Sequence, residues 1–361
     1  MPTTKKKNVW QRLKQEKALH LMMIPPLLFL FVFSYLPMGG IVIAFQKYSP
    51  AKGILGSKWV GFQQFRYVFR LPTFLNVIQN TFFIACAKII LTLVCTVTFA
   101  LLLNEVRNRT FKKMVQTITY LPHFLSWVIL GGIFVDILSP SSGFVNQFLK
   151  LLGIEPIFFL GDPQVFPWTI ILTDVWKELG FGAVVYIAAL TAIDPTFYEA
   201  AVIDGASRWQ QTLYVTLPAI APTIVLMATL SMGNVLNAGF DQVYNMYSIA
   251  VYSTGDIIDT FVYRLGLEDF QFSASTAVGL FKSAISTTLI VASYKIADWT
   301  TGYNKARQLA SFIDHLEKAP ASLEEWDSQV WSLLLEKGTV NRDGSVAFEF
   351  RNGKEIKVEA K

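Results

Sequence analysis

The chain has 361 residues, of which 53% are hydrophobic and only 16% charged, with a mean hydropathy of +0.42 and a formal net charge of +5. Soluble domains carry about 25% charged residues, so this composition excludes an ordinary soluble protein. The stretches 18–46, 114–135 and 209–240 contain no Asp, Glu, Lys or Arg. Because a bilayer core requires about 20 apolar residues per helix, the sequence predicts an all-α membrane protein.

Six membrane-spanning helices are predicted in chain order. They lie at 24–45, 80–103, 115–138, 168–190, 217–240 and 273–296. The first apolar run is longer than the core of a signal peptide, and no small-residue cleavage site follows it, which indicates a retained helix. We therefore expect an N-terminal segment at 1–23 and a transmembrane domain at 24–299.

The distribution of basic residues predicts the orientation. Arg107, Arg109, Lys112 and Lys113 lie between spans two and three, whereas 140–167 contains a single basic residue. Cytoplasmic loops are the ones enriched in Lys and Arg, so both termini are expected in the cytoplasm of a multi-pass cell-membrane protein. The segment 46–79 disagrees, because it is predicted outside yet carries five basic residues and no acid.

Residues 304–361 differ in composition and are predicted to form a small soluble α+β tail. Ser322 and Glu325 form a capping-box pattern ahead of a helix. Asp343-Gly344 and Asn352-Gly353 are typical of hairpin turns. Between them Val346, Phe348 and Phe350 alternate as in a half-buried strand.

The loop between spans four and five, residues 194–218, has the strongest local signals. Asp194 can cap a helix that has Pro195 at its first position. Ala200 and Ala201 leave a surface that another protein can approach closely, and Gly205 permits a sharp turn. A second helix then runs through Pro218 into span five, so we expect a rigid lever attached to a transmembrane helix.

These residues resemble the EAA loop of permeases of binding-protein-dependent ABC importers. The resemblance rests on Glu199-Ala200-Ala201, Asp204-Gly205-Ala206 and Leu217-Pro218. It implies the type I ABC importer permease fold and a loop that docks on a separate ATP-binding subunit. It also implies a second homologous permease and an extracytoplasmic solute-binding lipoprotein as partners, with no nucleic acid bound.

The resemblance extends over residues 20–299. The segments 34–38, 120–127 and 271–273 are similar to those of carbohydrate importers, including polysaccharide and lipoprotein permeases, which implies that a saccharide is transported. A permease for another solute remains the alternative. Residues 325–327 and those from 343 onward resemble the C-terminal end of large serine recombinases, which implies a fusion tail.

Charged residues within the predicted spans are candidates for the solute path. Lys88 lies in span two, Asp174, Lys177 and Glu178 in span four, and Lys282 in span six. An isolated charge at such depth costs about 2.5–3.5 kcal/mol, so these side chains should face the interior. Glu178 and Lys282 match in depth and are predicted to pair, either as structural partners or as a polar constriction.

A stripe of polar residues is predicted on one face of span five, because its members recur every three or four residues. It comprises Ser231, Asn234, Asn237 and Asp241. Such a stripe in a membrane either holds helices together or lines a pore. The amides of Asn234 and Asn237 suit sugar hydroxyls, which makes them candidate path residues.

Enzymatic classes find little support in the sequence. The three histidines are scattered, and no catalytic cluster, metal-ligand spacing or phosphate-binding loop is present. No cofactor, metal or catalytic residue is therefore expected. A membrane-embedded glycosyl or acyl transferase and an ion-coupled transporter are the rival classes, but the first needs an acid–base cluster and the second often has two related halves.

Overall fold

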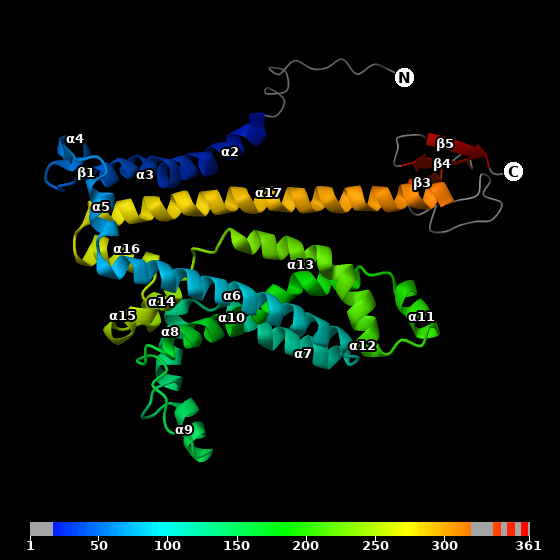
Figure 1. Cartoon of the computed structure of the whole chain (residues 1–361), viewed down its shortest axis with the longest axis horizontal. Helices are drawn as coiled ribbons and strands as arrows, with labels where there is room; N and C mark the ends of the chain where they lie inside the picture. Colours follow the sequence, from blue (N-terminus) through cyan, green and yellow to red (C-terminus); the bar gives the residue numbers. More distant parts are fainter. Residues whose placement is uncertain (1–16, 319–334, 341–344, 351–354, 360–361) are drawn as a thin grey trace. The chain divides into compact units, whose positions relative to one another are not determined.

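The computed structural model describes residues 17–318, 335–340, 345–350 and 355–359. It divides into two compact units, Met1–Ser293 and Tyr294–Lys361. The helices and strands are labelled in Figure 1. The predicted capping box at 322–325 and the hairpin turns at 343–344 and 352–353 lie outside the described residues.

The first two predicted spans are continuous helices. α2 (Lys17–Leu30) continues through the π-helix η1 (Phe31–Tyr35), α3 (Leu36–Met38) and the 3-10 helix η2 (Gly39–Phe45). The second span is α6 (Pro72–Glu105), a helix of 34 residues. Short elements connect them: β1 (Gln46–Lys47), α4 (Gly53–Gly56), β2 (Lys58–Trp59) and α5 (Gln63–Phe69).

The span predicted at 115–138 is present, but it is bent. The structure has α7 (Arg109–Tyr120), the 3-10 helix η3 (Leu121–Phe124) and α8 (Trp127–Ile137), with a bend of 104° between the two parts. Pro122 has no backbone N–H and lies in the 3-10 turn η3, and the chain leaves the helical conformation at Leu125, whose ψ is 137°. Ser126 then caps α8 by accepting a hydrogen bond from the Ile129 amide. α9 (Phe144–Leu151) follows.

Span four is α10 (Phe166–Thr191), and α11 (Pro195–Ile203) turns away from it by 69°. Span five starts earlier than predicted. α12 (Arg208–Gln211), the π-helix η4 (Thr212–Thr216) and α13 (Leu217–Met232) form one run of 25 residues.

Span five also ends earlier than the predicted residue 240. After Met232 the chain turns through the irregular segment 233–239, and α14 (Phe240–Met246) begins after Gly239, which has a φ of +91°. Gly and Asn are poor helix formers, and Gly233 and Asn234 stand where α13 ends. The prediction of a continuous helical stripe through Asn234 and Asn237 is therefore wrong.

The connection to span six consists of η5 (Ile249–Val251), α15 (Tyr252–Gly255), α16 (Ile258–Tyr263) and η6 (Arg264–Glu268). α17 (Phe272–Lys318) contains span six but runs beyond the predicted end at 296. In the second unit, β3 (Leu335–Val340), β4 (Ser345–Phe350) and β5 (Glu355–Glu359) form an antiparallel sheet in that order. The strand predicted around Val346, Phe348 and Phe350 is confirmed.

The core of the first unit is built where α6 and α10 pack together along their lengths. One cluster joins Ile84 of α6, Phe166 and Ile170 of α10, and Val243 of α14, all completely buried. α7 also packs closely on α10, and this packing requires Gly180 of α10. A Cβ atom there would lie 2.2 Å from the carbonyl oxygen of Thr119 in α7. The α6–α10 pair thus forms the frame on which the other spans are placed.

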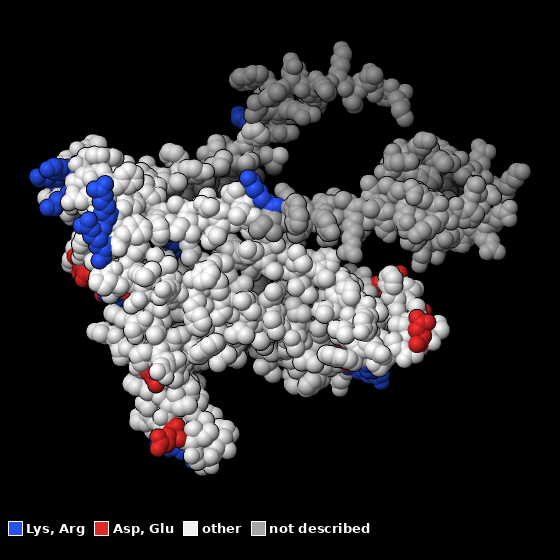
Figure 2. Space-filling view, viewed as in Figure 1, with Lys and Arg blue, Asp and Glu red and all other residues white. Residues whose placement is uncertain are grey.

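The outer surface agrees with a membrane protein. Among the described residues, four helices are long and apolar enough to cross a bilayer, and six spans result if each of the two bent pairs counts as one. Figure 2 shows uncharged side chains over the length of these helices, with charged ones gathered over α4 and α5 at one end and α7 and α11 at the other. The prediction of an all-α membrane protein is confirmed.

We predict that removal of residues 319–361 leaves the first unit folded, because its core clusters lie within residues 68–278. The truncated chain should insert into membranes in near-normal amounts, and its unfolding temperature in detergent should stay within about 2 °C of the full chain. Membrane quantification and thermal unfolding measure this. Aggregation of the truncated chain would contradict the independence of the first unit.

Candidate functional site

A polar cavity of about 290 Å³ lies among α6, α10, α13 and the segment 233–239. The side chains around it combine hydroxyl, amide and charged groups with apolar ones. The polar lining residues are Lys88, Thr92, Thr96, Asp174, Glu178, Tyr186, Ser231, Asn234 and Asn237. The predicted path residues Asp174, Glu178, Asn234 and Asn237 therefore meet at one site together with Lys88, whereas Lys177 and Lys282 do not line it.

Lys88 is the cation at this cavity, and its residue is only 6% exposed. Its Nζ donates to Asp174 Oδ1 of α10 at 3.2 Å, to the carbonyl oxygen of Ala238 at 2.8 Å and to Gln242 Oε1. All three protons of the ammonium group thus have acceptors. This lysine ties α6 to α10 and to the segment that follows span five.

Gln242 completes the same network from α14. Its residue is fully buried, and its Nε2 donates to the Ile170 carbonyl oxygen and to Thr173 Oγ1, both at 2.8 Å. Buried polar groups are costly unless they are hydrogen-bonded, and here each side-chain atom of the amide has a partner. Nothing in the sequence indicated that Gln242 takes part in this network, apart from its being a polar residue near an apolar run.

A second charged group lies where α10 meets the bend in span three. Lys177 Nζ donates to the His123 carbonyl oxygen at 2.9 Å and to Glu178 Oε1 at 3.1 Å. Glu178 Oε2 lies 2.7 Å from His123 Nδ1, and the His123 ring stacks on Phe181 with centroids 4.0 Å apart. Lys177 and Glu178 thus pair within span four, and His123 is packed against α10.

The predicted pair of Glu178 and Lys282 is wrong. Lys282 Nζ contacts both carboxylate oxygens of Asp259 in α16, at 2.5 and 2.7 Å. Lys282 is not among the residues that line the cavity. Matching depth along two helices could not show which faces meet, and α16, whose existence the sequence did not indicate, supplies the closer acid.

Three of the four residues predicted as a polar stripe on span five do lie together, but not on one continuous helix. Ser231 is on α13, whereas Asn234 and Asn237 lie on the irregular segment after it, yet all three line the cavity. Asp241 is on α14 and is not a lining residue. An unwound segment at membrane depth is tolerated where it lines a cavity, which is the situation here.

The 194–218 loop has the local structure that its residues predicted. Asp194 accepts a hydrogen bond from the Thr196 amide at 2.9 Å, and this contact lowers the pKa of its carboxyl group. Gly205 has a φ of +76° at the end of α11. The amides of Gly205 and Ala206 bond to the carbonyl oxygens of Val202 and Ala201, a Schellman arrangement that requires a left-handed residue.

The second half of the loop is fixed to the rest of the first unit. Ser207 caps α12 in a reciprocal capping box with Gln210. Arg208 Nη1 donates to Glu105 Oε2 at the end of α6 over 2.8 Å. The loop is therefore a defined helix–turn–helix, and its second helix is held at the end of α6.

One face of this loop is exposed and partly apolar. Glu199, Ala200, Asp204 and Gly205 are exposed, and Ala201 and Ala206 are half-buried. Next to them Val202, Ile203 and Trp209 are 61%, 85% and 74% exposed. A contiguous apolar surface rimmed by acids is typical of a protein interaction site.

Sequence comparison accounts for this combination of a polar cavity and a structured loop. Residues 92–299 match the family described as "Binding-protein-dependent transport system inner membrane component". The chain belongs to this family. It is therefore a membrane permease component of a transport system.

The permease is similar to two proteins of Bacillus subtilis. It is 42% identical to the polygalacturonan/rhamnogalacturonan transport system permease protein YteP, over 81% of this chain and 91% of that protein. It is also 42% identical to Protein LplB, over 79% of this chain and 90% of that one.

A solved structure shows the same fold. A chain of a bacterial ABC transporter involved in the import of the acidic polysaccharide alginate matches with a TM-score of 0.74 and 35% identity, over 81% of this permease and 99% of that chain. The same transporter was also solved with a periplasmic protein that holds an alginate pentasaccharide. The predicted type I importer fold is confirmed.

We predict that Lys88→Met destabilises the permease by about 3–5 kcal/mol, because it leaves Asp174 without its partner and the buried Ala238 carbonyl and Gln242 Oε1 without their donor. Lys88→Met with Asp174→Asn should recover part of this loss, since the remaining groups are neutral. Thermal unfolding in detergent measures both. Lys150→Met, at an exposed lysine of α9, is the matched control. Wild-type stability of Lys88→Met would show that the network is dispensable.

Proposed function

We propose that this permease carries an oligosaccharide across the cell membrane through the polar cavity, and that the 194–218 loop couples this movement to ATP hydrolysis in a separate subunit. The observation that carries the proposal is the convergence of Ser231, Asn234 and Asn237 with Asp174 and Glu178 around one cavity. The chain itself supplies the path rather than a catalytic group.

The chemistry of the cavity favours a saccharide. Amide and hydroxyl groups both donate and accept hydrogen bonds, and sugar hydroxyls need partners of both kinds. Asp174 and Glu178 add acceptors, with side chains that are 20% and 33% exposed. The relatives support the same class, since YteP and the alginate transporter act on polysaccharides.

The charges at the cavity do not select for an acidic saccharide. The Lys88 ammonium is already bound to three acceptors, and Lys177 is bound to Glu178 and His123. No cation of the described cavity lining is therefore left to pair with a uronate. A negatively charged solute would have to find its cations on the second permease of the complex.

The 194–218 loop provides the coupling site in this proposal. Glu199, Ala200, Ala201, Asp204, Gly205 and Ala206 form the surface that docks on the ATP-binding subunit. Exposed apolar side chains beside them supply the area for burial, and the Gly205 turn fixes the direction of the lever. Closure of the two ATP-binding subunits then moves span five, to which the loop is joined.

The remaining partners follow from the family. We propose a second homologous permease and an extracytoplasmic solute-binding lipoprotein, with both termini of this chain in the cytoplasm. The basic residues of 104–114 support this orientation, because they flank the ends of α6 and α7 near the coupling loop. ATP hydrolysis belongs to the separate subunits.

The cavity can be tested in proteoliposomes that contain the complete transporter and its binding protein. Asn234→Ala and Asn237→Ala should each slow uptake of the preferred oligosaccharide about fivefold to fiftyfold, as one or two lost hydrogen bonds allow. Asn76→Ala, at an exposed position of α6, should transport normally. Unchanged uptake by both cavity variants, or uptake of non-sugar solutes only, would reject the proposed saccharide path.

The coupling loop can be tested with two glycines of equal geometry. Gly205 and Gly153 both have a φ of +76°, and an added Cβ atom would contact nothing within 4 Å at either position. Gly205→Val and Gly153→Val should therefore each cost about 1–3 kcal/mol of backbone strain. We expect uptake and ATP-binding-subunit capture to fall only in Gly205→Val. Equal losses in both variants would contradict a docking role.

A further inference from the structure

A single side-chain hydrogen bond joins the docking helix to span five in the part of the chain that the structure describes. Tyr198 Oη of α11 lies 3.0 Å from Thr216 Oγ1, at the end of the π-helix η4. Tyr198 is half-buried and Thr216 is only 4% exposed. The two residues are separated by 18 positions along the loop.

The direction of this bond follows from the second contact of Thr216. Its hydroxyl donates to the Gln211 carbonyl oxygen at 3.3 Å, so it accepts the proton of the Tyr198 hydroxyl. The result is a chain from the Tyr198 phenol to Thr216 and then to the backbone of η4. It holds the wider turn of a π-helix, an element that is often found at functional sites.

The neighbours of Tyr198 are more exposed than Tyr198 itself. Glu199 and Ala200 are exposed on the proposed docking face, while Tyr198 points inward. A force applied to the outer face of α11 therefore reaches span five through the adjacent inward residue. The connection through the backbone is longer, because it must pass the Gly205 turn and α12.

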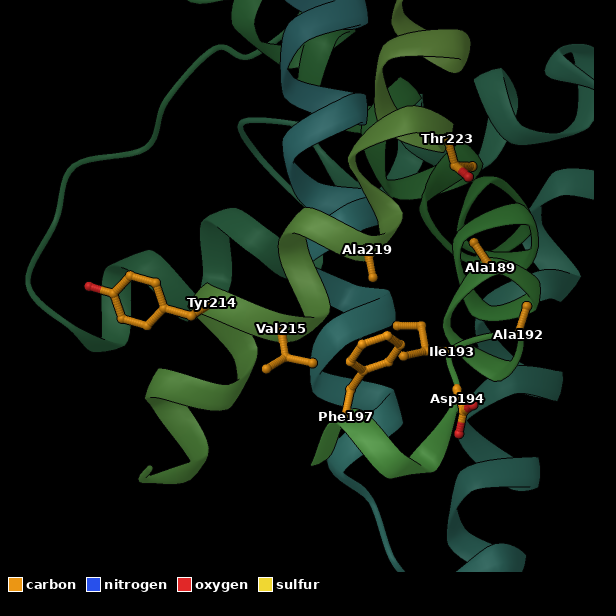
Figure 3. Close-up of a pocket in the computed structure, with 9 residues that line it drawn as sticks. All are labelled: Ala189, Ala192, Ile193, Asp194, Phe197, Tyr214, Val215, Ala219 and Thr223. Carbon is orange, nitrogen blue, oxygen red and sulfur yellow. The ribbon is translucent and has the colours of Figure 1, made fainter. Parts of the chain in front are cut away.

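Apolar packing alone does not fill the space between these elements. A cavity of about 590 Å³ lies between the end of α10, α11 and the start of α13. Figure 3 shows Phe197, Ile193 and Val215 around this space, with Tyr214 pointing away from it. Because van der Waals contact is lost across a gap, the hydroxyl contact is the stiffer connection.

We infer that the Tyr198–Thr216 hydrogen bond is a strut that transmits movement of the docking helix to span five. Tyr198 and Thr216 are positioning residues, since neither is proposed to touch the solute or ATP. This inference rests on the proposed function of the 194–218 loop. It predicts that breaking this hydrogen bond uncouples ATP hydrolysis from the conformational change of the permease. The ATP-binding subunits should stay bound.

Two substitutions break the strut from opposite ends. Tyr198→Phe removes one hydroxyl and leaves the contact of Thr216 with Gln211, whereas Thr216→Val removes the other hydroxyl at constant shape. Thr216→Ser keeps a hydroxyl and should preserve coupling. Tyr214→Phe is the matched control, because Tyr214 is a 72% exposed tyrosine of the same π-helix.

The readout is independent of the solute. Ser231→Cys, in a chain that also carries Cys86→Ala and Cys95→Ala, reports access to the polar cavity in the assembled transporter. Trapping the ATP-binding subunits with ATP and vanadate should change the rate of thiol labelling at this position. In Tyr198→Phe and Thr216→Val that change should shrink about twofold to tenfold, the range for one neutral hydrogen bond, with ATP-binding subunits still captured.

The effects of the two single substitutions on the vanadate-induced change in labelling rate should not add. Thr216→Val already removes the interaction that Tyr198→Phe removes, so the double variant should lose no more coupling than Thr216→Val alone. A labelling change as large as that of the wild type in both single variants would overturn the inferred role of this hydrogen bond. Loss of ATP-binding-subunit capture, or an unfolded permease, in both Thr216→Val and Tyr198→Phe would overturn it as well. Failure of the wild-type complex to take up any saccharide would instead reject the proposed function and leave this readout unaffected.

Discussion

The burial of one ammonium group determines how the first unit is assembled. Lys88 draws acceptors from α10, from the backbone after span five and from α14. Within a bilayer there is no water to replace any of them. The lysine can be accommodated only if the chain at Ala238 leaves the helix and offers its carbonyl oxygen, and only if Gln242 turns its amide inward. The interruption of span five and the polar cavity are therefore consequences of the same constraint.

This constraint also explains why the glycine at 239 matters. Its φ of +91° directs the chain from the irregular segment into α14, and a Cβ atom there would lie 3.1 Å from Lys88 Nζ. A side chain would therefore be strained by the backbone and would crowd the ammonium group. Gly239 allows the Ala238 carbonyl and Gln242 to reach the same lysine from either side of a sharp turn.

Local chemistry was predictable from the sequence, and long-range pairing was not. The cap at Asp194 and the turn at Gly205 each depend on the residue itself and its neighbours along the chain. The partner of Lys282 depends on which faces of α16 and α17 meet, a question that depth along a span cannot answer. Asp259 therefore replaced Glu178 as the partner.

The cavity is intermediate between a local feature that the sequence predicts and a long-range pairing that it does not. The stripe in span five correctly selected Ser231, Asn234 and Asn237 as lining residues, but for an incorrect reason, since the helix ends at Met232. Polar residues in an apolar stretch must face a wet or polar interior whether or not they are helical. Composition therefore located the site, whereas the periodicity of the stripe did not describe its backbone.

Span five connects the two sites. Thr216 at its root and Ser231 at the cavity are 15 positions apart, so at 1.5 Å per residue they are separated by about 22 Å of helix. A rigid helix would pass a displacement at one end directly to the other. Two features limit that rigidity, the π-helix η4 and Pro222 inside α13. Pro222 has no backbone N–H to bond the residue four positions earlier. Bending of span five is therefore easiest between η4 and Pro222. A movement of the loop would then tilt the part of α13 that carries Ser231, while the frame of α6 and α10, held by Lys88, stays in place.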